Sequence, residues 1–311
     1  MTRHLLADDD LTPAEQSAVL ALAARLKKAP YDATPLAGPR TVAMIFDKPT
    51  LRTQASFAAG VAELGGNPML VDGALAGIGV RESIADVARV LGRQAAVIVW
   101  RTYGQDRIEE MATYAGVPVV NALTDDYHPC QLLADLLTIR EHRGALAGQS
   151  VAFVGDGACN MGNSWLLAGA TAGLHLRIAA PDGYAPAHSM VERAAAIAER
   201  TGGSVELDLD PERVVAGADV VVTDTWVSMG KEDEADSRLR VFGPYSVTTD
   251  LFARAKEDAI LLHCLPAYRG KEVDAEVLDG PRSVIWDEAE NRRHAQKAII
   301  TWLLDAGGGH D

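Results

Sequence analysis

Short apolar runs alternate with amphipathic stretches along the chain from Thr41 onward. Turn-forming residues bound most of these runs, and many are rich in valine and isoleucine, which predicts buried strands. The predicted strands cover 41–46, 68–72, 95–100, 117–121, 150–154, 175–180, 204–208, 218–223, 259–263 and 283–286. Apolar residues spaced three and four apart predict helices between most of them. These helices lie roughly at 53–64, 82–93, 106–115, 130–142, 162–171, 188–201 and 288–305. Near the start, Thr12 as N-cap, followed by Pro13 and Glu15, predicts one more helix.

This alternation predicts parallel sheets with helices on both faces. Ten predicted strands exceed a comfortable single twisted sheet, so we expect two doubly wound α/β domains. A new strand begins just after Gln149, which favours a first domain at 1–143 and a second at 144–287. In such sheets ligands bind beyond the carboxyl ends of the strands. The chemistry is therefore expected at those ends.

Composition narrows the class of protein. A hydrophobic content of 48% with 23% charged residues is typical of a soluble globular protein. No apolar run approaches the roughly 20 residues that span a bilayer, and the N-terminus has too short an apolar core for a signal peptide. We therefore expect a cytoplasmic protein. A net charge of −14 argues against nucleic-acid and acidic-membrane partners. Three cysteines without a CxxC motif predict neither a disulfide framework nor a zinc knuckle.

A candidate phosphate cradle follows the first predicted strand. Thr50, Arg52 and Thr53 lie in the connection between that strand and the helix that follows it. Free N–H groups and the positive end of the helix dipole favour an anion there, and hydroxyls and a guanidinium suit phosphate oxygens. The stretch lacks the glycine-rich loop of a nucleotide-binding P-loop. An ordinary helix N-cap beside a solvated arginine explains it equally well when it is taken alone.

Two further groups of polar residues stand at strand ends in the first half. Arg101 ends a predicted strand, a position that a solvated cap also explains. His128 and Gln131 open a helix in the sequence His-Pro-Cys-Gln and can hydrogen-bond a carbonyl and an amide. A zinc site is a poor interpretation of His128, because no partner has ligand spacing. A core histidine bonded to backbone remains an alternative.

The second half carries three more candidates. Gly155-Asp156-Gly157 resembles the start of a dinucleotide-binding turn, but Asn160 stands where the third glycine belongs, so the helix is not expected to pack as closely on the strand. Asp224 and Cys264 follow two predicted strands of one sheet, where a carboxylate and a thiol can hold an ammonium group. Cys264 taken alone is better explained as a small buried apolar residue. Arg292 begins the last helix and supplies another cation.

Together these motifs resemble the ornithine carbamoyltransferases, a branch of the aspartate/ornithine carbamoyltransferase superfamily. The order and spacing match over essentially the whole chain. The motifs are Thr50-Leu51-Arg52-Thr53, Trp100-Arg101-Thr102, His128-Pro129-Cys130-Gln131, Asp224-Thr225-Trp226-Val227-Ser228-Met229-Gly230, His263-Cys264-Leu265-Pro266 and Glu290-Asn291-Arg292. The Ser-Met-Gly and His-Cys-Leu-Pro segments are similar to the ornithine-using branch and not to the aspartate-using branch.

The resemblance implies a role for each matching residue. The residues expected to bind carbamoyl phosphate are Thr50, Leu51 through its N–H, Arg52, Thr53, Arg101, His128, Gln131 and Arg292. Those expected to bind ornithine are Asn160, Asp224, Ser228, Met229, Cys264 and Leu265. Catalysis is expected to fall to Arg101, His128, Asp224 and Cys264. The resemblance also implies that the C-terminal helix, 288–311, returns to the first domain.

The implied reaction transfers the carbamoyl group of carbamoyl phosphate to the δ-amine of L-ornithine, giving L-citrulline and phosphate. The expected role is arginine biosynthesis, although nothing in the motifs separates it from a catabolic role. The family forms homotrimers in which a neighbouring subunit completes each site. It needs no metal and no organic cofactor.

Two positions depart from the family pattern. Gln54 replaces the second arginine of the phosphate motif, and Gly77 stands about where the family presents a glutamine across the subunit boundary. A missing donor in a buried polar site costs about 1–3 kcal/mol, so we expect a raised KM for carbamoyl phosphate.

These departures leave room for a sister carbamoyltransferase acting on putrescine, lysine or an N-acylated ornithine. A catalytically weak paralogue with a regulatory role is another alternative. An NAD-dependent dehydrogenase built on the Gly155–Gly157 turn is more remote, because the third glycine is absent and the phosphate motif is left unexplained.

Overall fold

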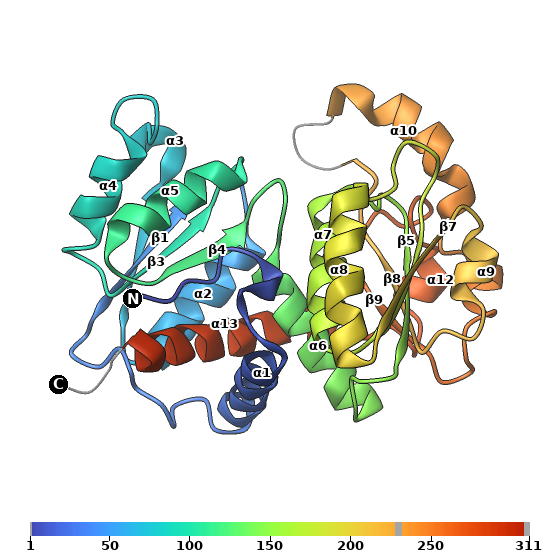
Figure 1. The fold of residues 1–311 in the computed structure, drawn as a ribbon, viewed down its shortest axis with the longest axis horizontal. Coiled ribbons are helices and arrows are strands. Elements are labelled where there is room, and N and C mark those ends of the chain that lie inside the picture. The colour runs from blue at the N-terminus through green and yellow to red at the C-terminus, as the bar shows by residue number, and fades with distance from the viewer. Residues whose placement is uncertain (1, 228–231, 308–311) are drawn as a thin grey trace. The chain divides into compact units, whose positions relative to one another are not determined.

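A computed structural model of the chain describes residues 2–227 and 232–307. The chain divides into two compact units (Figure 1). Unit 1 comprises Met1–Leu137 together with Glu290–Asp311, and unit 2 comprises Thr138–Ala289. The division falls inside two helices, α6 (Pro129–Arg143) and α13 (Ile285–Gly307), and not in a loop after residue 143.

Unit 1 is built on a parallel sheet with strand order β2-β1-β3-β4. Its strands are β1 (Thr41–Phe46), β2 (Asn67–Asp72), β3 (Val97–Arg101) and β4 (Val119–Leu123). Its helices are η1 (Asp8–Asp10), α1 (Pro13–Lys28), α2 (Arg52–Glu63), α3 (Gly73–Ala76), α4 (Ile84–Leu91), α5 (Gln105–Ala115), the start of α6 and most of α13. In Figure 1, α4 and α5 lie on one side of this sheet and α2 and α13 on the other.

The register of this sheet brings two predicted site segments to one edge. Phe46, the last residue of β1, pairs with Arg101, the last residue of β3. The N–H of Asp47 donates to the carbonyl of Arg101 over 2.9 Å, so the pairing continues one residue further. Because the strands are parallel, the segment after Phe46 and the side chain of Arg101 both belong to the carboxyl edge.

Asp47 fixes this edge of unit 1. Its carboxylate accepts hydrogen bonds from Trp100 (3.1 Å) and Thr102 (2.6 Å), and it forms an ion pair with Arg107. Gly73, at the start of α3, approaches so closely that a Cβ there would lie 1.8 Å from the carboxylate. The glycine is therefore needed for close approach, and α3 is held against the end of β1.

Unit 2 is built on a second parallel sheet, with strand order β7-β6-β5-β8-β9. Its strands are β5 (Ser150–Val154), β6 (His175–Ala179), β7 (Ser204–Asp208), β8 (Val220–Thr223) and β9 (Ile260–Leu262). Its helices are α7 (Asn160–Thr171), α8 (His188–Thr201), α9 (Pro211–Val215), η2 (Glu232–Glu234), α10 (Ala235–Phe242), η3 (Gly243–Tyr245), α11 (Thr249–Phe252) and α12 (Ala275–Leu278). The chain order reverses between β5 and β8, so the expected ligand position is beyond the ends of these two strands.

The prediction of two doubly wound parallel-sheet domains is confirmed, and α13 packs within unit 1 as expected. The predicted strand at 283–286 is wrong. Ser283 forms an isolated bridge with Leu261, and α13 begins at Ile285. Val284 and Ile285 are buried, so this apolar run reflects the burial of a helix start.

The first helix begins as predicted. The Thr12 hydroxyl accepts a hydrogen bond from the N–H of Glu15, and the Glu15 carboxylate accepts one from the N–H of Thr12, which completes the capping box. Across 2–227 and 232–307, no helix has both the length and the apolar character that membrane crossing requires.

Candidate active site

The predicted phosphate cradle begins α2 in unit 1. The Thr50 hydroxyl accepts the N–H of Thr53 over 3.3 Å and so caps the first turn. Leu51, between Thr50 and Arg52, is 79% exposed. Arg52 is the first residue of the helix. The turn therefore offers N–H groups, a helix dipole and a guanidinium at one place, which favours an anion.

His128 lies beside three arginines, and this group is here called the cation cluster. Burial, followed by the positive charges of the arginines, holds the pKa of His128 well below its ordinary value of 6.5. The three arginines are, in falling order of effect, Arg292, Arg101 and Arg52. The imidazole is therefore uncharged at neutral pH and can take part in hydrogen bonds without adding a charge.

Arg292 joins three segments that are distant in the sequence. Its guanidinium donates to the Thr53 hydroxyl over 2.9 Å and forms a short hydrogen bond with the Gln131 side-chain oxygen. Gln131 in turn donates to Asp135 over 2.8 Å. All four side chains are buried. The guanidinium of the last helix therefore contacts both the start of α2 and the His-Pro-Cys-Gln segment at the start of α6.

The cation cluster suits a small, strongly charged anion that carries a carbonyl group. Three guanidinium groups supply planar forks for phosphate oxygens, and an uncharged imidazole and a carboxamide supply polar groups for a neutral part. The cluster also brings like charges together inside a protein of net charge −14. It can therefore attract an anion locally, against the overall field of the chain.

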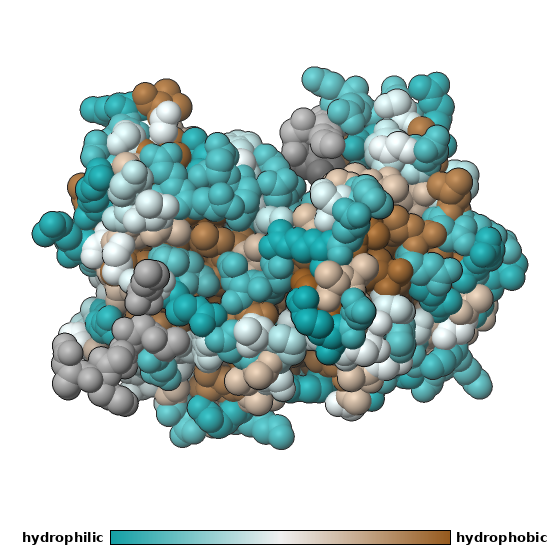
Figure 2. All heavy atoms as spheres, in the orientation of Figure 1, coloured by the Kyte–Doolittle hydropathy of each residue, from teal (hydrophilic) through white to brown (hydrophobic). Residues whose placement is uncertain are grey.

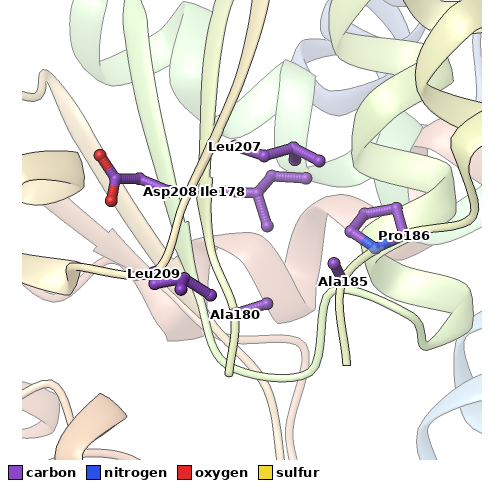
Figure 3. Close-up of a pocket in the computed structure, with 7 residues that line it drawn as sticks. All are labelled: Ile178, Ala180, Ala185, Pro186, Leu207, Asp208 and Leu209. Carbon is purple, nitrogen blue, oxygen red and sulfur yellow. The ribbon is translucent and has the colours of Figure 1, made fainter. Parts of the chain in front are cut away.

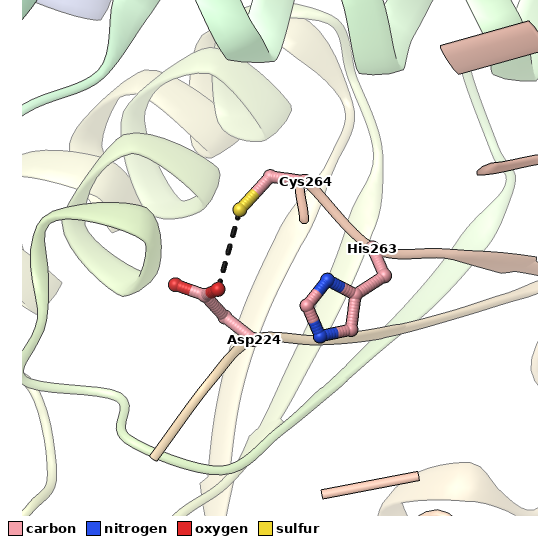
Figure 4. A group of neighbouring side chains, drawn as sticks. All are labelled: Asp224, His263 and Cys264. Atoms are coloured by element: carbon pink, nitrogen blue, oxygen red, sulfur yellow. Dashed lines mark hydrogen bonds between the residues drawn. The ribbon is translucent and has the colours of Figure 1, made fainter. Parts of the chain in front are cut away.

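In unit 2, three side chains gather beyond the ends of β8 and β9, and this group is here called the Asp224 cluster (Figure 4). It consists of Asp224, His263 and Cys264. The Cys264 thiol donates to the Asp224 carboxylate over 3.2 Å. Burial raises the pKa of Asp224, while His263 and the Cys264 hydrogen bond oppose that rise. A carboxylate in such surroundings gains strongly from an ammonium partner.

His263 is held by backbone and by a buried carboxylate. Its Nδ1 accepts the N–H of Leu265 over 2.9 Å, so its ring proton is on Nε2, which faces Glu272 at 3.3 Å. The N–H of His263 donates to the buried carboxylate of Glu288 over 2.8 Å. Leu265 has a φ of 60°, a left-handed conformation that costs about 1–2 kcal/mol for a residue with a side chain. The hydrogen bond to His263 helps to hold the backbone there, next to Cys264.

The Asp224 cluster has the spacing of a metal site, since its ligand atoms lie within 4.8 Å of one another. Both ring nitrogens of His263 are already engaged, however, one by Leu265 and one by Glu272. A metal ion would have to break one of these buried contacts. The arrangement therefore favours a cationic organic ligand over a metal ion.

Asn160 begins α7, after the turn that contains Gly155 and Gly157. The Asp156 carboxylate lies within this turn, where it accepts the N–H of Ala158 over 3.1 Å. That N–H is therefore already bound within the turn and is not offered to the pyrophosphate of a dinucleotide, which weakens the dehydrogenase alternative further.

The sequence interpretation of the glycine pattern was incomplete. Close packing of α7 is achieved by Gly162, two residues beyond the expected position: a Cβ there would lie 2.2 Å from the carbonyl oxygen of Gly157. The helix therefore does pack closely on the turn, without a glycine at position 160.

A cavity of about 330 Å3 opens beside the ends of β6 and β7 (Figure 3). Asp208 is the single charged residue in its lining, and the other lining residues are Ile178, Ala180, Ala185, Pro186, Leu207 and Leu209. Brown, apolar atoms also show in the part of Figure 2 where Figure 1 labels β7, and Leu209 is 62% exposed. None of the predicted site residues within 2–227 and 232–307 lines this cavity.

The structure thus gathers most of the predicted residues into two groups, one in each unit. Ser228 and Met229 lie outside the described residues. Three polar residues that support the groups were not identified from the sequence: Asp135, Glu272 and Glu288. Each contacts a predicted residue, but none stands in a recognisable motif.

These features define a two-domain α/β protein with an anion-binding cation cluster in one unit and a carboxylate–thiol pair in the other. A family model described as "Aspartate/ornithine carbamoyltransferase, carbamoyl-P binding domain" matches residues 3–141. A second, described as the "Asp/Orn binding domain" of the same family, matches residues 147–303.

Individual relatives agree with these family models. A protein of Clavibacter michiganensis named "Ornithine carbamoyltransferase" is 63% identical over 98% of this chain and 99% of its own length. The solved ornithine carbamoyltransferase of Pyrococcus furiosus has a TM-score of 0.94 and 42% identity, and covers 100% of this chain and 98% of its own. The anabolic enzyme of Campylobacter jejuni has a TM-score of 0.93 and 36% identity, with 98% of this chain and 99% of its own covered. The chain belongs to the aspartate/ornithine carbamoyltransferase family.

Proposed function

We propose that the chain transfers the carbamoyl group of carbamoyl phosphate to the δ-amine of L-ornithine, giving L-citrulline and phosphate. The observation that carries this proposal is the cation cluster, in which His128 is kept uncharged among three arginines. The names of relatives that are more than half identical to this chain support the same reaction.

Carbamoyl phosphate is assigned to unit 1. Its phosphate group is placed at the start of α2, on Thr50, Arg52 and Thr53 and on the N–H of Leu51. Arg292 then lies beside the phosphate, since it already donates to Thr53. Arg101 and His128 are placed at the carbonyl oxygen, with Gln131 at the carbamoyl amide.

Ornithine is assigned to unit 2. Asp224 and Cys264 lie 3.2 Å apart, so one ammonium or amine group can contact both. Asn160 and the backbone at Leu265 are placed around the rest of the substrate. Ser228 and Met229 are retained in this proposal on the sequence resemblance alone.

The reaction needs a neutral amine. At pH 7 an alkyl ammonium with a pKa near 10.4 must lose its proton at a cost of roughly 4.6 kcal/mol. The amine nitrogen then forms a bond to the carbonyl carbon as the carbon–oxygen bond to phosphate breaks. Two protons leave the nitrogen in all. The ammonium gives up the first to solvent before the attack, and the second passes from the nitrogen to the departing phosphate, which leaves as hydrogen phosphate. Arg101 and His128 stabilise the charge that develops on the carbonyl oxygen, which is usually the largest catalytic contribution.

We further infer that the chain works in the cytoplasm in arginine biosynthesis, and that it assembles as a homotrimer with shared sites. Apolar side chains stand exposed around the start of α2 and around α3, which Figure 2 shows as brown atoms near the α3 end of unit 1. They are Leu51, Leu70, Leu75 and Val80. A patch of this kind favours a protein partner. Light scattering is expected to give three times the chain mass of 33.1 kDa.

An acceptor panel tests the proposed reaction. The purified chain is incubated with carbamoyl phosphate and L-ornithine, putrescine, L-lysine or N-acetyl-ornithine, and both the carbamoylated product and phosphate are measured. We expect L-ornithine to be preferred. Preference for another acceptor would establish a sister carbamoyltransferase, and no product with any acceptor would support a catalytically weak paralogue.

A further inference from the structure

Arg238, on α10 in unit 2, is a buried cation that the sequence motifs do not include. It is 2% exposed. Its guanidinium donates to the Asp156 carboxylate over 2.7 Å and to the Trp226 carbonyl over 2.9 Å. Its Nε donates to Glu234 over 2.9 Å. One side chain therefore binds three separate segments of unit 2.

Aromatic rings enclose the same guanidinium. Its carbon lies 5.0 Å from the ring centre of Tyr184 and 5.6 Å from that of Phe242. Phe242 also stacks on Trp226, with ring centres 5.9 Å apart. These contacts fix the orientation of the planar fork, which suits it to bind two acceptors at once.

The two main acceptors stand in adjacent turns at the expected ligand position. Asp156 belongs to the turn after β5, four residues before Asn160, and Trp226 follows β8, two residues after Asp224. Strands β5 and β8 are neighbours, and the order of the sheet reverses between them. Arg238 therefore bridges the segments that present Asn160 and Asp224.

We propose that Arg238 is a positioning residue for the amino-acid substrate. It sets the spacing between the Asn160 segment and the Asp224 segment, because one guanidinium nitrogen, Nη1, holds both the Asp156 carboxylate and the Trp226 carbonyl. This inference rests on the proposed function, since it assigns the amino-acid substrate to that pair of segments.

A purely stabilising role is a weaker account of this residue. Removing a guanidinium from water costs several kcal/mol, and well-packed apolar residues often replace buried ion pairs without loss of stability. An aromatic cluster such as this one could be filled by an apolar side chain. An apolar side chain at this position would pack equally well, but it could not connect the two turns that carry substrate-binding candidates, as Arg238 does.

The test uses steady-state kinetics of the full-length chain. Arg238→Met keeps an apolar stem and removes the guanidinium. Arg238→Lys keeps the charge, but it has a shorter side chain and loses the hydrogen bond from Nε to Glu234. The matched control is Arg240→Met, since Arg240 lies on the same helix and is exposed. The KM for L-ornithine is measured at saturating carbamoyl phosphate. Affinity for carbamoyl phosphate is measured by calorimetry without ornithine.

We expect Arg238→Met to raise the KM for L-ornithine about tenfold or more, the scale expected for one charge-assisted hydrogen bond. Arg238→Lys is expected to fall between Met and the wild type. Carbamoyl phosphate affinity is expected to stay within twofold in all variants, and Arg240→Met to resemble the wild type. If Arg238→Met does not fold, Asp156→Asn replaces it, because that change removes the charged acceptor and keeps the side-chain shape.

The outcomes separate the two proposals. An unchanged ornithine KM in folded Arg238→Met, or in Asp156→Asn where it replaces that variant, would overturn the positioning role and leave the proposed function intact. An equal loss of affinity for both substrates would show a general structural role and would also overturn it. If the wild-type chain and Arg240→Met form no citrulline, the proposed function fails, and the role of Arg238 fails with it.

Discussion

Replacing Gly162 with alanine should separate α7 from the turn that precedes it. A Cβ at this position would lie 2.2 Å from the carbonyl oxygen of Gly157, which is about 1 Å inside ordinary carbon–oxygen contacts of roughly 3.3–3.6 Å. The atom it meets belongs to the backbone, so no side chain can rotate away. The first turn of α7 must move, and Asn160 moves with it.

The size of the effect follows from two opposing contributions. Overpacking of a buried contact typically costs about 1–3 kcal/mol, and a backbone neighbour places this case near the upper figure. Alanine is favoured over glycine within a helix by about 1 kcal/mol, which offsets part of the loss. The net destabilisation is therefore about 2 kcal/mol. For a unit of this size that corresponds to a fall in Tm of about 4–8 °C.

Thermal unfolding by differential scanning calorimetry measures the change in Tm. Gly243→Ala is the matched control, because a Cβ at Gly243 meets nothing within 4 Å and its φ is not positive. Kinetics supply a second measurement: the KM for L-ornithine is expected to rise in Gly162→Ala, while carbamoyl phosphate affinity stays unchanged. A Tm for Gly162→Ala within 1 °C or so of the control would refute the argument, since the contact would then be relieved without cost.

Three further predictions concern unit 1. Arg101→Ala is expected to lower kcat by orders of magnitude with an unchanged circular dichroism spectrum; activity within a few-fold of the wild type would remove Arg101 from the mechanism. The pKa of His128 is lowered in the folded chain, so the unfolded chain binds a proton at this residue first as the pH falls below about 6.5. His128 should therefore lower the free energy of unfolding by about 1.4 kcal/mol for each pH unit below that value. Urea titrations between pH 7.5 and 5.5 measure the free energy of unfolding, and its fall with pH should be smaller in His128→Asn by this amount. Parallel pH profiles for His128→Asn and the wild type would contradict the prediction. Gly77→Gln is expected to lower the KM for carbamoyl phosphate about fivefold or more relative to Gly77→Ala. Gly77→Ala is the control because it carries the same backbone strain at a φ of 63°. Equal KM values for the two variants would count against a missing donor.

The inner strands of the sheets could be predicted because they are buried on both faces, although the edge strands β2 and β7 are not. Every strand of the two parallel sheets overlaps a predicted apolar run, and Val97–Trp100 is an example in which each residue is buried. The one wrong strand, 283–286, has the same apolar character for another reason, since Val284 and Ile285 are covered at the start of α13. The short helices α3, α9, α11 and α12 were not predicted, because four or five residues give too little periodicity.

The residues that could be predicted for the site belong to local motifs at strand ends. The residues that could not be predicted act through partners far along the chain. Arg238 and Asp156 are separated by 82 positions, and Arg292 and Thr53 by 239. No periodicity or spacing links such pairs. Arg292 was identified through the resemblance to the family. Arg238 belongs to no motif, so its contacts become evident only in the folded chain.

The two groups of site residues handle charge in opposite ways. In the Asp224 cluster and around it, each polar group already has a partner: the Cys264 thiol donates to Asp224, and His263 is engaged at both nitrogens. In the cation cluster, three arginines lie around an uncharged His128, and their positive charges help to hold its pKa down. A dianion that binds there forms charge-assisted hydrogen bonds with the guanidinium groups. This local positive charge explains how a chain of net charge −14 can bind a doubly charged substrate.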